Sequence, residues 1–593
     1  MADPTNSDIA AALDELGDLY ELDGAINYRV IAYRNAAKAV RDAPVSVSAL
    51  ARQRRATELP GIGQTIQEKV LALADDGAIP AAVRLRAKFP PGLLDITHLP
   101  GLGPKRARRL FDELAIDSLE SLTAAAQAHR IRSLKGFGPK AEESMLAAAQ
   151  AAAAQAPGHD GAARRVVLDR ALAVGEELVA ALREHPAAAH VELAGSARRM
   201  TDSVKDLDVI ATAREPGALA QAAAELDLVE VAQTPSESGV RLRTHTGLRV
   251  DLRIVAPDQF GNLLQHFTGS KEHNMALREA AVRKGLHVSE YGILDDATGQ
   301  THRCATEAEV YALLGLQYIE PELRENRGEL EAAAAGTLPD LVRRSDLRGD
   351  LHCHTTASDG TASIEEMAVA ARDAGYTYLA ITDHSASFGF GDEVSPDRLR
   401  EQVAQIRSVA VDGLELLAGS EVNILPNGSL DYDDTLLAEL DWVIASVHSS
   451  FQMDSEAMTA RIVSAIEHPL VDAIGHLSGR KIEQRPPYAF DIERVIEAAA
   501  RTGTMLEINS SPDRRDINDP NARAAAQAGI PIVINCDAHR TRGFDVLRYG
   551  VATARRGWLT ASDVANTRPW AELAAMRKRH GALAPRAQAR RDG

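Results

Sequence analysis

The sequence predicts a multidomain chain of α+β and α/β type, with a helical N-terminal region, a central mixed sheet and a C-terminal distorted (β/α)7 barrel. Three observations lead to this prediction. A Leu-x-Gly-φ-Gly pattern, in which φ is apolar, occurs three times between residues 59 and 138. A stretch near residue 200 reads as strand, turn and strand. After residue 345, short apolar runs alternate with helical segments, which is typical of βα units.

Length and composition limit the class of protein. At 593 residues the chain is too long for a single hydrophobic core, and no apolar run is long enough to span a membrane. The N-terminus lacks the pattern of a signal peptide and the three cysteines form no pair spacing, so we expect a cytoplasmic protein. The net charge of −18 argues against nucleic-acid binding by the whole surface, but a local basic face decides phosphate affinity.

The three glycine repeats are "LPGIG", "LPGLG" and "LKGFG", each followed by a helical pattern. Glycines two residues apart permit a tight turn that leaves backbone N–H groups open at a helix N-terminus, where they can bind a phosphate. One copy is equally typical of an ordinary helix connection, whereas three copies indicate helix-hairpin-helix motifs that bind a nucleic-acid backbone. The predicted DNA contacts are Gly61, Gly63, Gly101, Gly103, Lys105, Arg106, Arg109, Gly136, Gly138 and Lys140.

Three carboxylates are predicted to converge in the central region. Asp206 and Asp208 lie two residues apart on a predicted strand and therefore point to the same face, and Asp251 lies on a second strand, "LRVDLRIV". Converging like charges require a cation between them, and a pair of Mg²⁺ or Mn²⁺ ions would stabilise a phosphoryl displacement. The predicted triphosphate contacts in the preceding turn are Gly195, Ser196 and Arg199.

Two stretches resemble family X DNA polymerases. "YRVIAYRNAAKAV" with "LPGIGQTIQEKV" resembles their N-terminal lyase-type domain, where a Schiff-base lysine occupies the position of Lys69; a phosphate contact is the alternative role. "LLQHFTGSKEHNMALREAAVRKGLHVSEYGI" resembles the stretch that holds the incoming nucleotide. His266 stands where many relatives carry a tyrosine against the sugar, so weaker rejection of ribonucleotides is expected. The nucleotide contacts that the resemblance implies are His266, Gly269, Ser270, Asn274 and Arg278.

Most apolar runs of the C-terminal region end in a residue that can bind a metal ion. Functional groups at strand ends are typical of the active face of a (β/α) barrel. Imidazole and carboxylate ligands without thiolate suit a cluster of Mn²⁺, Zn²⁺ or iron, which activates water for phosphoester hydrolysis. A single such histidine is more often structural or exposed, but the repetition indicates a site. The predicted ligands are His352, His354, Asp359, His384, Glu421, His448, His476, Asp537 and His539, with Asn509 as a candidate outer contact.

This ligand set resembles the PHP (polymerase and histidinol phosphatase) domain, and the whole chain is similar to bacterial family X DNA polymerases with a C-terminal PHP domain. The resemblance implies gap-filling synthesis in base excision repair, with 3′–5′ exonuclease and abasic-site nicking in the barrel. The expected partners are gapped or primed DNA and deoxynucleoside triphosphates, without a membrane, and the expected state is a monomer. Two alternatives are a nucleotidyltransferase fused to a small-molecule phosphatase and a DNA-bridging scaffold with inactive sites.

The motifs also predict where the domains begin and end. The predicted domains are a lyase-like DNA-binding region (1–88), a second helix-hairpin-helix region (89–158), a nucleotidyltransferase palm (159–258), a nucleotide- and template-binding subdomain (259–325), a linker (326–348), the PHP barrel (349–575) and a basic tail (576–593).

Overall fold

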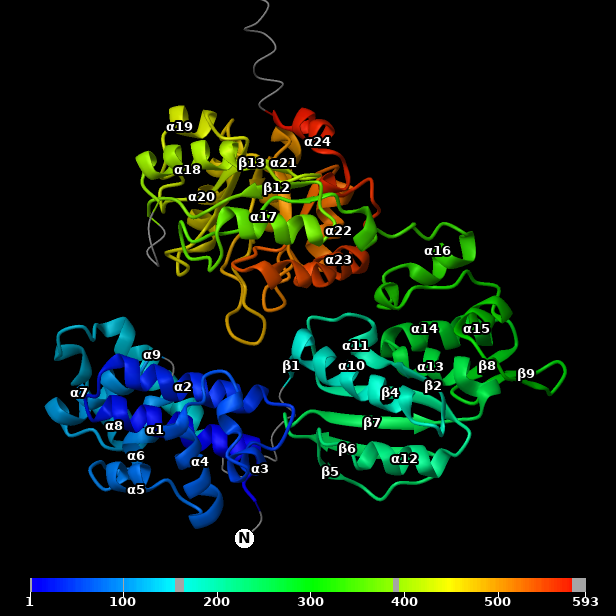
Figure 1. Ribbon diagram of the computed structural model, residues 1–593, viewed down its shortest axis with the longest axis horizontal. Coiled ribbons are helices and arrows are strands. Elements are labelled where there is room, and N and C mark those ends of the chain that lie inside the picture. Colours follow the sequence, from blue (N-terminus) through cyan, green and yellow to red (C-terminus); the bar gives the residue numbers. More distant parts are fainter. Residues whose placement is uncertain (1–2, 100, 155–164, 388–393, 579–593) are drawn as a thin grey trace, which may run out of the picture. The chain divides into compact units, whose positions relative to one another are not determined.

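The computed structural model describes residues 3–99, 101–154, 165–387 and 394–578 (Figure 1). The chain divides into two compact units. The first comprises Met1–Arg164, Ala173–Glu192 and Lys205–Val255, and the second comprises Arg165–Leu172, Leu193–Val204 and Ala256–Gly593. Most of the predicted basic tail, residues 579–593, lies outside the described residues. None of the helices in the described ranges is both long enough and apolar enough to cross a membrane.

The N-terminal part of the first unit is entirely helical and has two hydrophobic cores. The helices are α1 (Asn6–Leu22), α2 (Asn27–Asp42), α3 (Val47–Arg52), α4 (Gln64–Asp76), α5 (Pro80–Arg86), α6 (Pro91–Thr97), α7 (Pro104–Leu114), α8 (Leu119–Gln127) and α9 (Pro139–Ala154). The predicted hairpins are confirmed, because α4, α7 and α9 each begin directly after a glycine pair. The first glycine of each pair has a left-handed backbone, with φ of +86° at Gly61, +79° at Gly101 and +89° at Gly136.

The first unit also contains a mixed sheet, which confirms the predicted palm architecture. Its strand order is β2-β4-β7-β6-β5. The strands are β2 (Ala188–Leu193), β4 (Asp206–Ala213), β5 (Val229–Ala232), β6 (Gly239–Thr244) and β7 (Arg249–Ile254), with the helices α10 (Leu168–Glu184) and α12 (Pro216–Ala224). Parallel pairing of β4 and β7 sets Asp208 beside Asp251, and antiparallel pairing of β6 and β7 sets Arg241 on the other side of Asp251.

The second unit begins with short elements around a small core that includes Leu277, Val310 and Leu330. Its elements before the barrel are β1 (Val166–Val167), α11 (Gly195–Arg198), β3 (Ser203–Val204), α13 (Phe260–Thr268), α14 (Lys271–Val282), β8 (Leu286–Ser289), β9 (Gly292–Asp295), β10 (Thr301–His302), α15 (Glu307–Leu313) and α16 (Glu329–Ala335). The segment predicted as a linker is folded. It contains α16, where Glu329 accepts a hydrogen bond from His273 Nδ1 at 2.7 Å and both side chains are fully buried.

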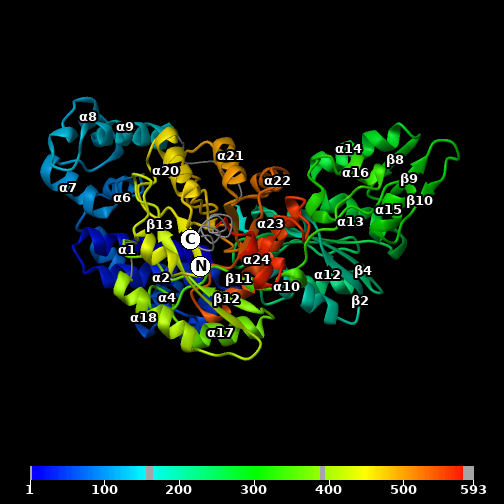
Figure 2. The ribbon, with the colours of Figure 1, turned by 90° about the horizontal axis from the view of Figure 1, so that it is seen from above.

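The C-terminal part of the second unit is a barrel of parallel strands that are hydrogen-bonded in chain order from β11 to β17. Its strands β11, β12 and β13 are labelled in Figure 2. The strands are β11 (Gly349–Asp350), β12 (Tyr378–Ile381), β13 (Glu415–Asn423), β14 (Trp442–Ser446), β15 (Ala473–Ile474), β16 (Met505–Asn509) and β17 (Ile532–Asn535). The accompanying helices are α17 (Ile364–Asp373), α18 (Pro396–Ser408), α19 (Asp434–Ala438), α20 (Ser455–Glu467), α21 (Ile492–Thr502), α22 (Asp519–Gln527), α23 (Leu547–Arg556) and α24 (Trp570–Met576). A parallel bridge between Cys353 and Ala538 joins the first and last strand ends, so the predicted seven-stranded barrel is confirmed.

A buried ion-pair network links α11 to α15. Glu307, at the start of α15, lies 2.6 Å from Arg198 Nη2 and 2.5 Å from Arg324 Nη1. Burial opposes ionisation of Glu307, but the two guanidinium groups dominate and lower the pKa of the carboxyl to about 2. Because the folded-state pKa lies below the unfolded one, the carboxylate stabilises the fold above about pH 4.5, and this contribution is lost as the pH falls toward 2.

We predict that Glu307→Gln destabilises the second unit by about 3 kcal/mol at pH 7, from the size of that pKa shift. The deficit relative to the wild type should shrink between pH 4.5 and 3. Urea unfolding of both proteins across this range measures the difference. A deficit that stays constant with pH would contradict the role given to the ionised carboxylate.

Candidate functional site

The candidate metal ligands of the barrel come from strand ends. The parallel strands carry their C-terminal ends on one face of the barrel, so side chains that follow different strands meet there. Pairs or single residues follow β11, β12, β14, β15 and β17, and Glu421 lies near the end of β13. The residues brought together are His352, His354, Asp359, His384, Glu421, His448, His476, Asp537 and His539.

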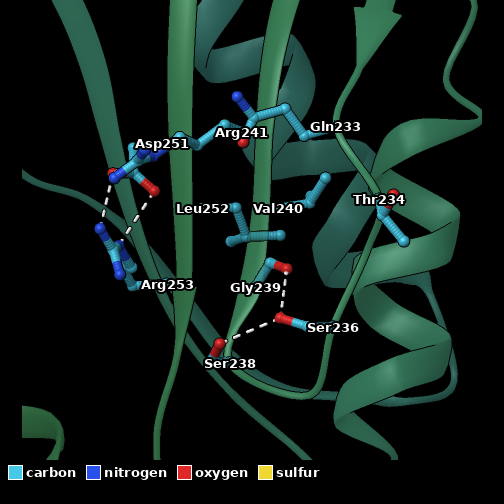
Figure 3. Close-up of a pocket in the computed structure, with 10 residues that line it drawn as sticks. All are labelled: Gln233, Thr234, Ser236, Ser238, Gly239, Val240, Arg241, Asp251, Leu252 and Arg253. Atoms are coloured by element: carbon cyan, nitrogen blue, oxygen red, sulfur yellow. Dashed lines mark hydrogen bonds and ion pairs between the residues drawn. The ribbon is translucent and has the colours of Figure 1, made fainter.

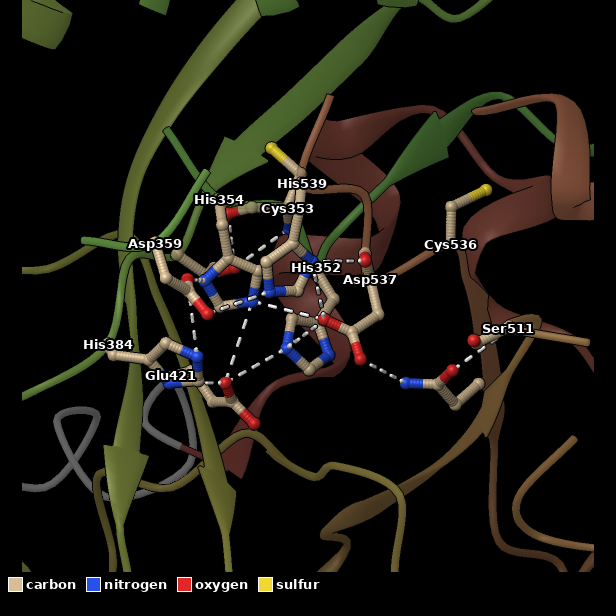
Figure 4. Close-up of polar contacts among 12 residues, drawn as sticks. His352, Cys353, His354, Asp359, His384, Glu421, Ser511, Cys536, Asp537 and His539 are labelled. Atoms are coloured by element: carbon tan, nitrogen blue, oxygen red, sulfur yellow. Dashed lines mark hydrogen bonds and ion pairs between the residues drawn. The ribbon is translucent and has the colours of Figure 1, made fainter. Parts of the chain in front are cut away.

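Glu421 contacts several histidines of this cluster, and Figure 4 shows it beside His384. Its carboxylate oxygens are within 3.6 Å of five histidine ring nitrogens; the shortest distances are 2.9 Å to His384 Nδ1 and 2.9 Å to His476 Nε2. Burial opposes its ionisation, yet the neighbouring histidines hold the pKa of Glu421 well below its usual value. The carboxyl group is therefore ionised at neutral pH.

Two further carboxylates contact the histidines of the cluster. Asp537 Oδ1 is 3.1 Å from His354 Nε2, and Asp359 Oδ2 is 3.3 Å from His539 Nε2. Burial, together with the neighbouring rings of His384 and His539, lowers the pKa of His354 to about 4. A histidine of this kind is neutral at pH 7, the form in which imidazole binds a metal ion.

The cluster fits a set of metal ions. Its ligand atoms fall into four overlapping groups, and within each group all lie within 4.8 Å of one another. Several buried atoms, among them His352 Nε2, His354 Nδ1 and Glu421 Oε2, make no hydrogen bond to the described residues. Buried polar atoms are nearly always satisfied, so bound cations account for these atoms well. Histidine nitrogen with carboxylate oxygen is a donor set for Mn²⁺, Zn²⁺ or iron.

Glu507 supports the cluster from behind and was not identified from the sequence. It is fully buried on β16, where Oε1 accepts a hydrogen bond from His352 Nδ1 at 2.7 Å and Oε2 accepts one from the backbone N–H of His476 at 2.8 Å. The contact leaves Nε2 of His352 facing the other candidate ligands. Two residues along the same strand, Asn509 donates to Asp537 Oδ2 at 3.0 Å. Glu507 could have been identified from the sequence, because it precedes Asn509 by two residues and so lies on the same face of the strand.

Asp383 supports the loop that carries Asp359, and it was also missed. Its Oδ1 accepts from the backbone N–H of Thr355 and its Oδ2 from the hydroxyl of Thr355, both at 2.7 Å. Ser358 Oγ and Gln402 Nε2 complete the buried shell around the carboxylate. The sequence "ITDH" contains both Asp383 and His384, but only His384 was predicted as a ligand, because it ends the apolar run.

In the first unit, the palm carboxylates lie on neighbouring strands. Asp206 and Asp208 are at the start of β4 and Asp251 is on β7. Asp251 shares a face of the sheet with Asp208, its partner on β4, and its side chain contacts two arginines. It lies 3.0 Å from Arg253 and 3.5 Å from Arg241, beside a pocket of about 150 Å³ (Figure 3). Within the described residues, side chains grouped closely enough to hold a metal ion occur in the barrel and not in the palm.

Part of the predicted nucleotide site forms a compact group in the second unit. Asn274 Nδ2 donates to the carbonyl of His266 at 2.7 Å, and Arg278 Nη2 lies 3.2 Å from His266 Nδ1. Ser270 caps α14 by accepting from the N–H of His273, and the Gly269–Ser270 peptide bond is cis.

Arg199, which is predicted to contact the triphosphate, has partners within the protein. Its side chain is only 13% exposed, because the guanidinium lies 3.1 Å from Glu325 and donates to the carbonyl of Thr268 at 2.6 Å. Gly195 and Ser196 begin the adjacent helix α11, in which Gly195 has a φ of +64°.

The basic residues of the hairpins have structural partners. Arg106 donates to the carbonyls of Gly101 and Gly136 and lies over the ring of Phe137, and Arg109 donates to the carbonyl of Lys135. These arginines therefore tie the second hairpin to the third. A Cβ atom placed on Gly63, Gly103 or Gly138 would have no atom of the described residues within 4 Å, apart from those of its own residue and its chain neighbours. These turns therefore leave room for a phosphate.

Lys69 lies on α4 with its ammonium 5.9 Å from the ring centre of Tyr33. Burial, assisted by the positive charges of Arg84 and Arg29, lowers the pKa of the Lys69 amine. A lowered pKa increases the fraction of neutral amine, which is the nucleophilic form.

Comparisons with known proteins agree with this architecture. Family models match as a helix-hairpin-helix domain (4–79), a SAM-like helix-hairpin-helix tandem (93–151), the DNA polymerase beta thumb (263–325) and the PHP domain (350–511). The chain is 36% identical over 577 residues, 97% of its length, to the DNA polymerase/3′-5′ exonuclease PolX of Bacillus subtilis (strain 168), of which 99% is covered. A probable phosphatase of Thermoanaerobacter sp. (strain X514) is 34% identical over 37% of this chain and 89% of its own length.

Fold and site thus define a two-enzyme chain, a nucleotidyltransferase joined to a metal-dependent phosphoesterase of the PHP type. The chain belongs to the bacterial family X DNA polymerases that carry a C-terminal PHP domain.

We predict that Glu507→Gln weakens metal binding by the barrel about 10–100-fold, because outer contacts of this kind orient a ligating histidine. Titration of the metal-stripped protein with Mn²⁺, followed by calorimetry, measures the effect. Glu497→Gln, on the barrel helix α21, serves as the control. Unchanged Mn²⁺ affinity in the Glu507 variant would show that His352 keeps its orientation without the carboxylate.

Proposed function

We propose that this chain fills short gaps in DNA during base excision repair and removes 3′-terminal nucleotides with its barrel. Membership of the family makes it a DNA polymerase with a 3′–5′ exonuclease. The observation that carries the proposal is the nine-residue cluster of histidines and carboxylates in the barrel of a chain that also has a palm and three hairpins. Such a cluster can serve a phosphodiesterase acting on the same DNA end that the palm extends.

In the proposed polymerase site, Asp206, Asp208 and Asp251 hold Mg²⁺ or Mn²⁺. To hold a metal ion, Asp251 would give up its contacts with Arg253 and Arg241. His266, Asn274 and Arg278, with Gly269 and Ser270, face the incoming nucleotide, and Gly195 and Ser196 receive the triphosphate. Arg199 then acts by fixing the turn from behind, through Glu325 and Thr268, as its contacts indicate.

In the proposed nuclease site, the nine clustered side chains hold Mn²⁺ or Zn²⁺, with iron as a third candidate. Such ions, when bound, activate water and offset the charge of the phosphate oxygens. Glu507 keeps His352 in the tautomer that presents Nε2, and Asp383 holds the loop of Asp359. Abasic-site nicking by the barrel and a Schiff-base lyase reaction at Lys69 belong to the same proposal, supported by the lowered pKa of that amine.

The proposed partners are gapped or primed DNA and deoxynucleoside triphosphates, bound by a monomer in the cytoplasm. The hairpin glycines provide open N–H groups for the DNA backbone, with Lys105 and Lys140 on the helices that follow. Because Arg106 and Arg109 also join two hairpins, their removal would affect folding of this region as well as DNA affinity.

We predict that the two activities are separable. Asp208→Ala removes a proposed palm ligand and should slow primer extension by ~10²–10⁴-fold, because charge stabilisation by a metal ion is worth several kcal/mol. His354→Ala should slow primer degradation to a similar extent. Each variant should keep the other reaction within a few-fold of the wild-type rate. Both reactions are measured on one labelled gapped duplex, with and without nucleotides, in Mg²⁺ and in Mn²⁺.

Circular dichroism and thermal melting check that both variants fold. If His354→Ala still degrades the primer at the wild-type rate, the nuclease does not lie in the barrel. If the wild type releases phosphate from a small ester but neither extends nor degrades a primer, the barrel is a small-molecule phosphatase.

We predict a second effect at His266. Burial lowers the pKa of this histidine, so the neutral ring accepts a hydrogen bond from Arg278 and presents less bulk than a tyrosine. His266→Tyr should raise the preference for deoxynucleotides over ribonucleotides by ~1–3 kcal/mol, the usual worth of a steric contact of this kind. Single-nucleotide insertion with each sugar measures the ratio. An unchanged ratio would remove His266 from the sugar pocket.

A further inference from the structure

The segment that contains the candidate triphosphate turn is joined to two loops of the barrel. It runs from Gly195 to Val204 and lies, with the barrel, in the second unit. Within it, Asp202 Oδ2 accepts a hydrogen bond from Arg480 Nη1 at 2.7 Å, and its Oδ1 lies 3.4 Å from Arg515 Nη1. Arg480 is in the loop after β15 and Arg515 in the loop after β16, so one carboxylate holds two neighbouring loops at the ligand-bearing end of the barrel.

Arg480 also donates hydrogen bonds to the backbone of the second loop, the one after β16. Its Nε donates to the carbonyl of Arg514 at 2.7 Å and its Nη2 to the carbonyl of Arg515 at 2.5 Å. The guanidinium is planar and rigid, so three partners are fixed relative to one another. The Arg480 side chain is only 12% exposed, and that shielding makes the contact stronger than a surface ion pair.

The two loops are also joined directly. Asp516, fully buried, accepts from the backbone N–H of Ser478 at 2.9 Å, and its own carbonyl accepts from the N–H of Asn509 at 2.6 Å. Arg515 is fully buried as well and donates to the hydroxyl of Thr553. A buried guanidinium needs a compensating charge, and Asp202 supplies part of it.

The second loop also contacts residues of the candidate metal centre. Arg514 Nε lies 3.9 Å from Asp537 Oδ2, the same oxygen that accepts from Asn509 Nδ2 at 3.0 Å. Ser511 N–H in turn donates to Asn509 Oδ1 at 3.0 Å, and Figure 4 shows Ser511 on the side of the cluster occupied by Asp537. A shift of the Arg514 backbone would therefore move a positive charge beside Asp537.

We propose that Asp202 is a positioning residue for phosphodiester hydrolysis in the barrel, acting through Arg480 and the Arg514 backbone on Asp537. The inference rests on the proposed nuclease function of the barrel. A residue of the polymerase half of the chain thereby sets the geometry of the nuclease site. A second contact braces the same segment, because Ser203 Oγ donates at 2.8 Å to Glu483, which lies in the same loop as Arg480.

The test compares Asp202→Ala, Arg480→Ala and the double variant with the wild type. The rate of 3′-nucleotide removal is measured on a labelled gapped duplex in Mn²⁺ without nucleotides. We expect kcat to fall about 10–100-fold in each single variant, the usual effect of removing an outer contact. The DNA concentration that gives half the maximal rate should stay within about threefold. The double variant should lose no more than a single one, because both residues act through one pair. Asp202→Asn, which keeps an acceptor for Arg480, should recover part of the rate.

Glu322→Ala is the matched control. Glu322 also joins the polymerase half to the barrel, through Arg555 on α23 at 2.7 Å. Among the described residues this pair bonds to neither of the two loops, so nuclease activity should stay within a few-fold. Mn²⁺ content and thermal melting are measured on every variant and should match the wild type. A wild-type rate in Asp202→Ala, multiplying losses in the double variant, or a loss accompanied by metal release and a lower melting temperature would each overturn the proposal. Failure of the proposed function is distinct, since it appears as full nuclease activity in His354→Ala.

Discussion

The carboxylate of Glu421 is the interaction on which the barrel site depends. A buried ion is costly unless opposite charges or hydrogen-bond donors surround it. Here, five histidines from four strand ends lie within 3.6 Å of its two oxygens. The same arrangement orients the imidazole rings toward a common volume that divalent ions can occupy. Asp359 and Asp537 extend this arrangement to His539, so that all the candidate ligands belong to one electrostatic unit.

The barrel makes this arrangement available by joining its two ends. Asp350 accepts hydrogen bonds from the backbone N–H groups of His352 and Cys536, which places the first strand end beside the last. Burial raises the pKa of Asp350 to about 7 in spite of these donors. Among the described residues, Asp350 is not part of the clustered candidate ligands. As a consequence, residues that are far apart in the chain stack on one another; the ring centres of His354 and His539 are 4.2 Å apart.

Arginine serves two purposes in this chain. A guanidinium offers five N–H donors in one plane, so it binds carbonyl groups and carboxylates as readily as phosphates. Arg106 uses these donors to hold two hairpins together, and Arg199 uses them on Glu325 and Thr268. Arg324 is fully buried between Glu307 and two tyrosine rings. In each of these three places the guanidinium joins segments of the protein to one another.

The sequence by itself determined the three-part architecture, the hairpin turns and the residues at the strand ends of the barrel. These features depend on local spacing, such as glycines two residues apart or a histidine directly after an apolar run, and local spacing is what a sequence displays. It did not reveal Glu507 or Asp383, the protein partners of Arg199, or the helix α16 within residues 326–348. Those outcomes depend on which distant side chain lies within hydrogen-bonding distance: Glu507 is 155 positions from His352, and Glu325 is 126 from Arg199. Only the tertiary structure decides such pairs, because the free energy of a buried charge depends on its partner and not on its neighbours in the chain.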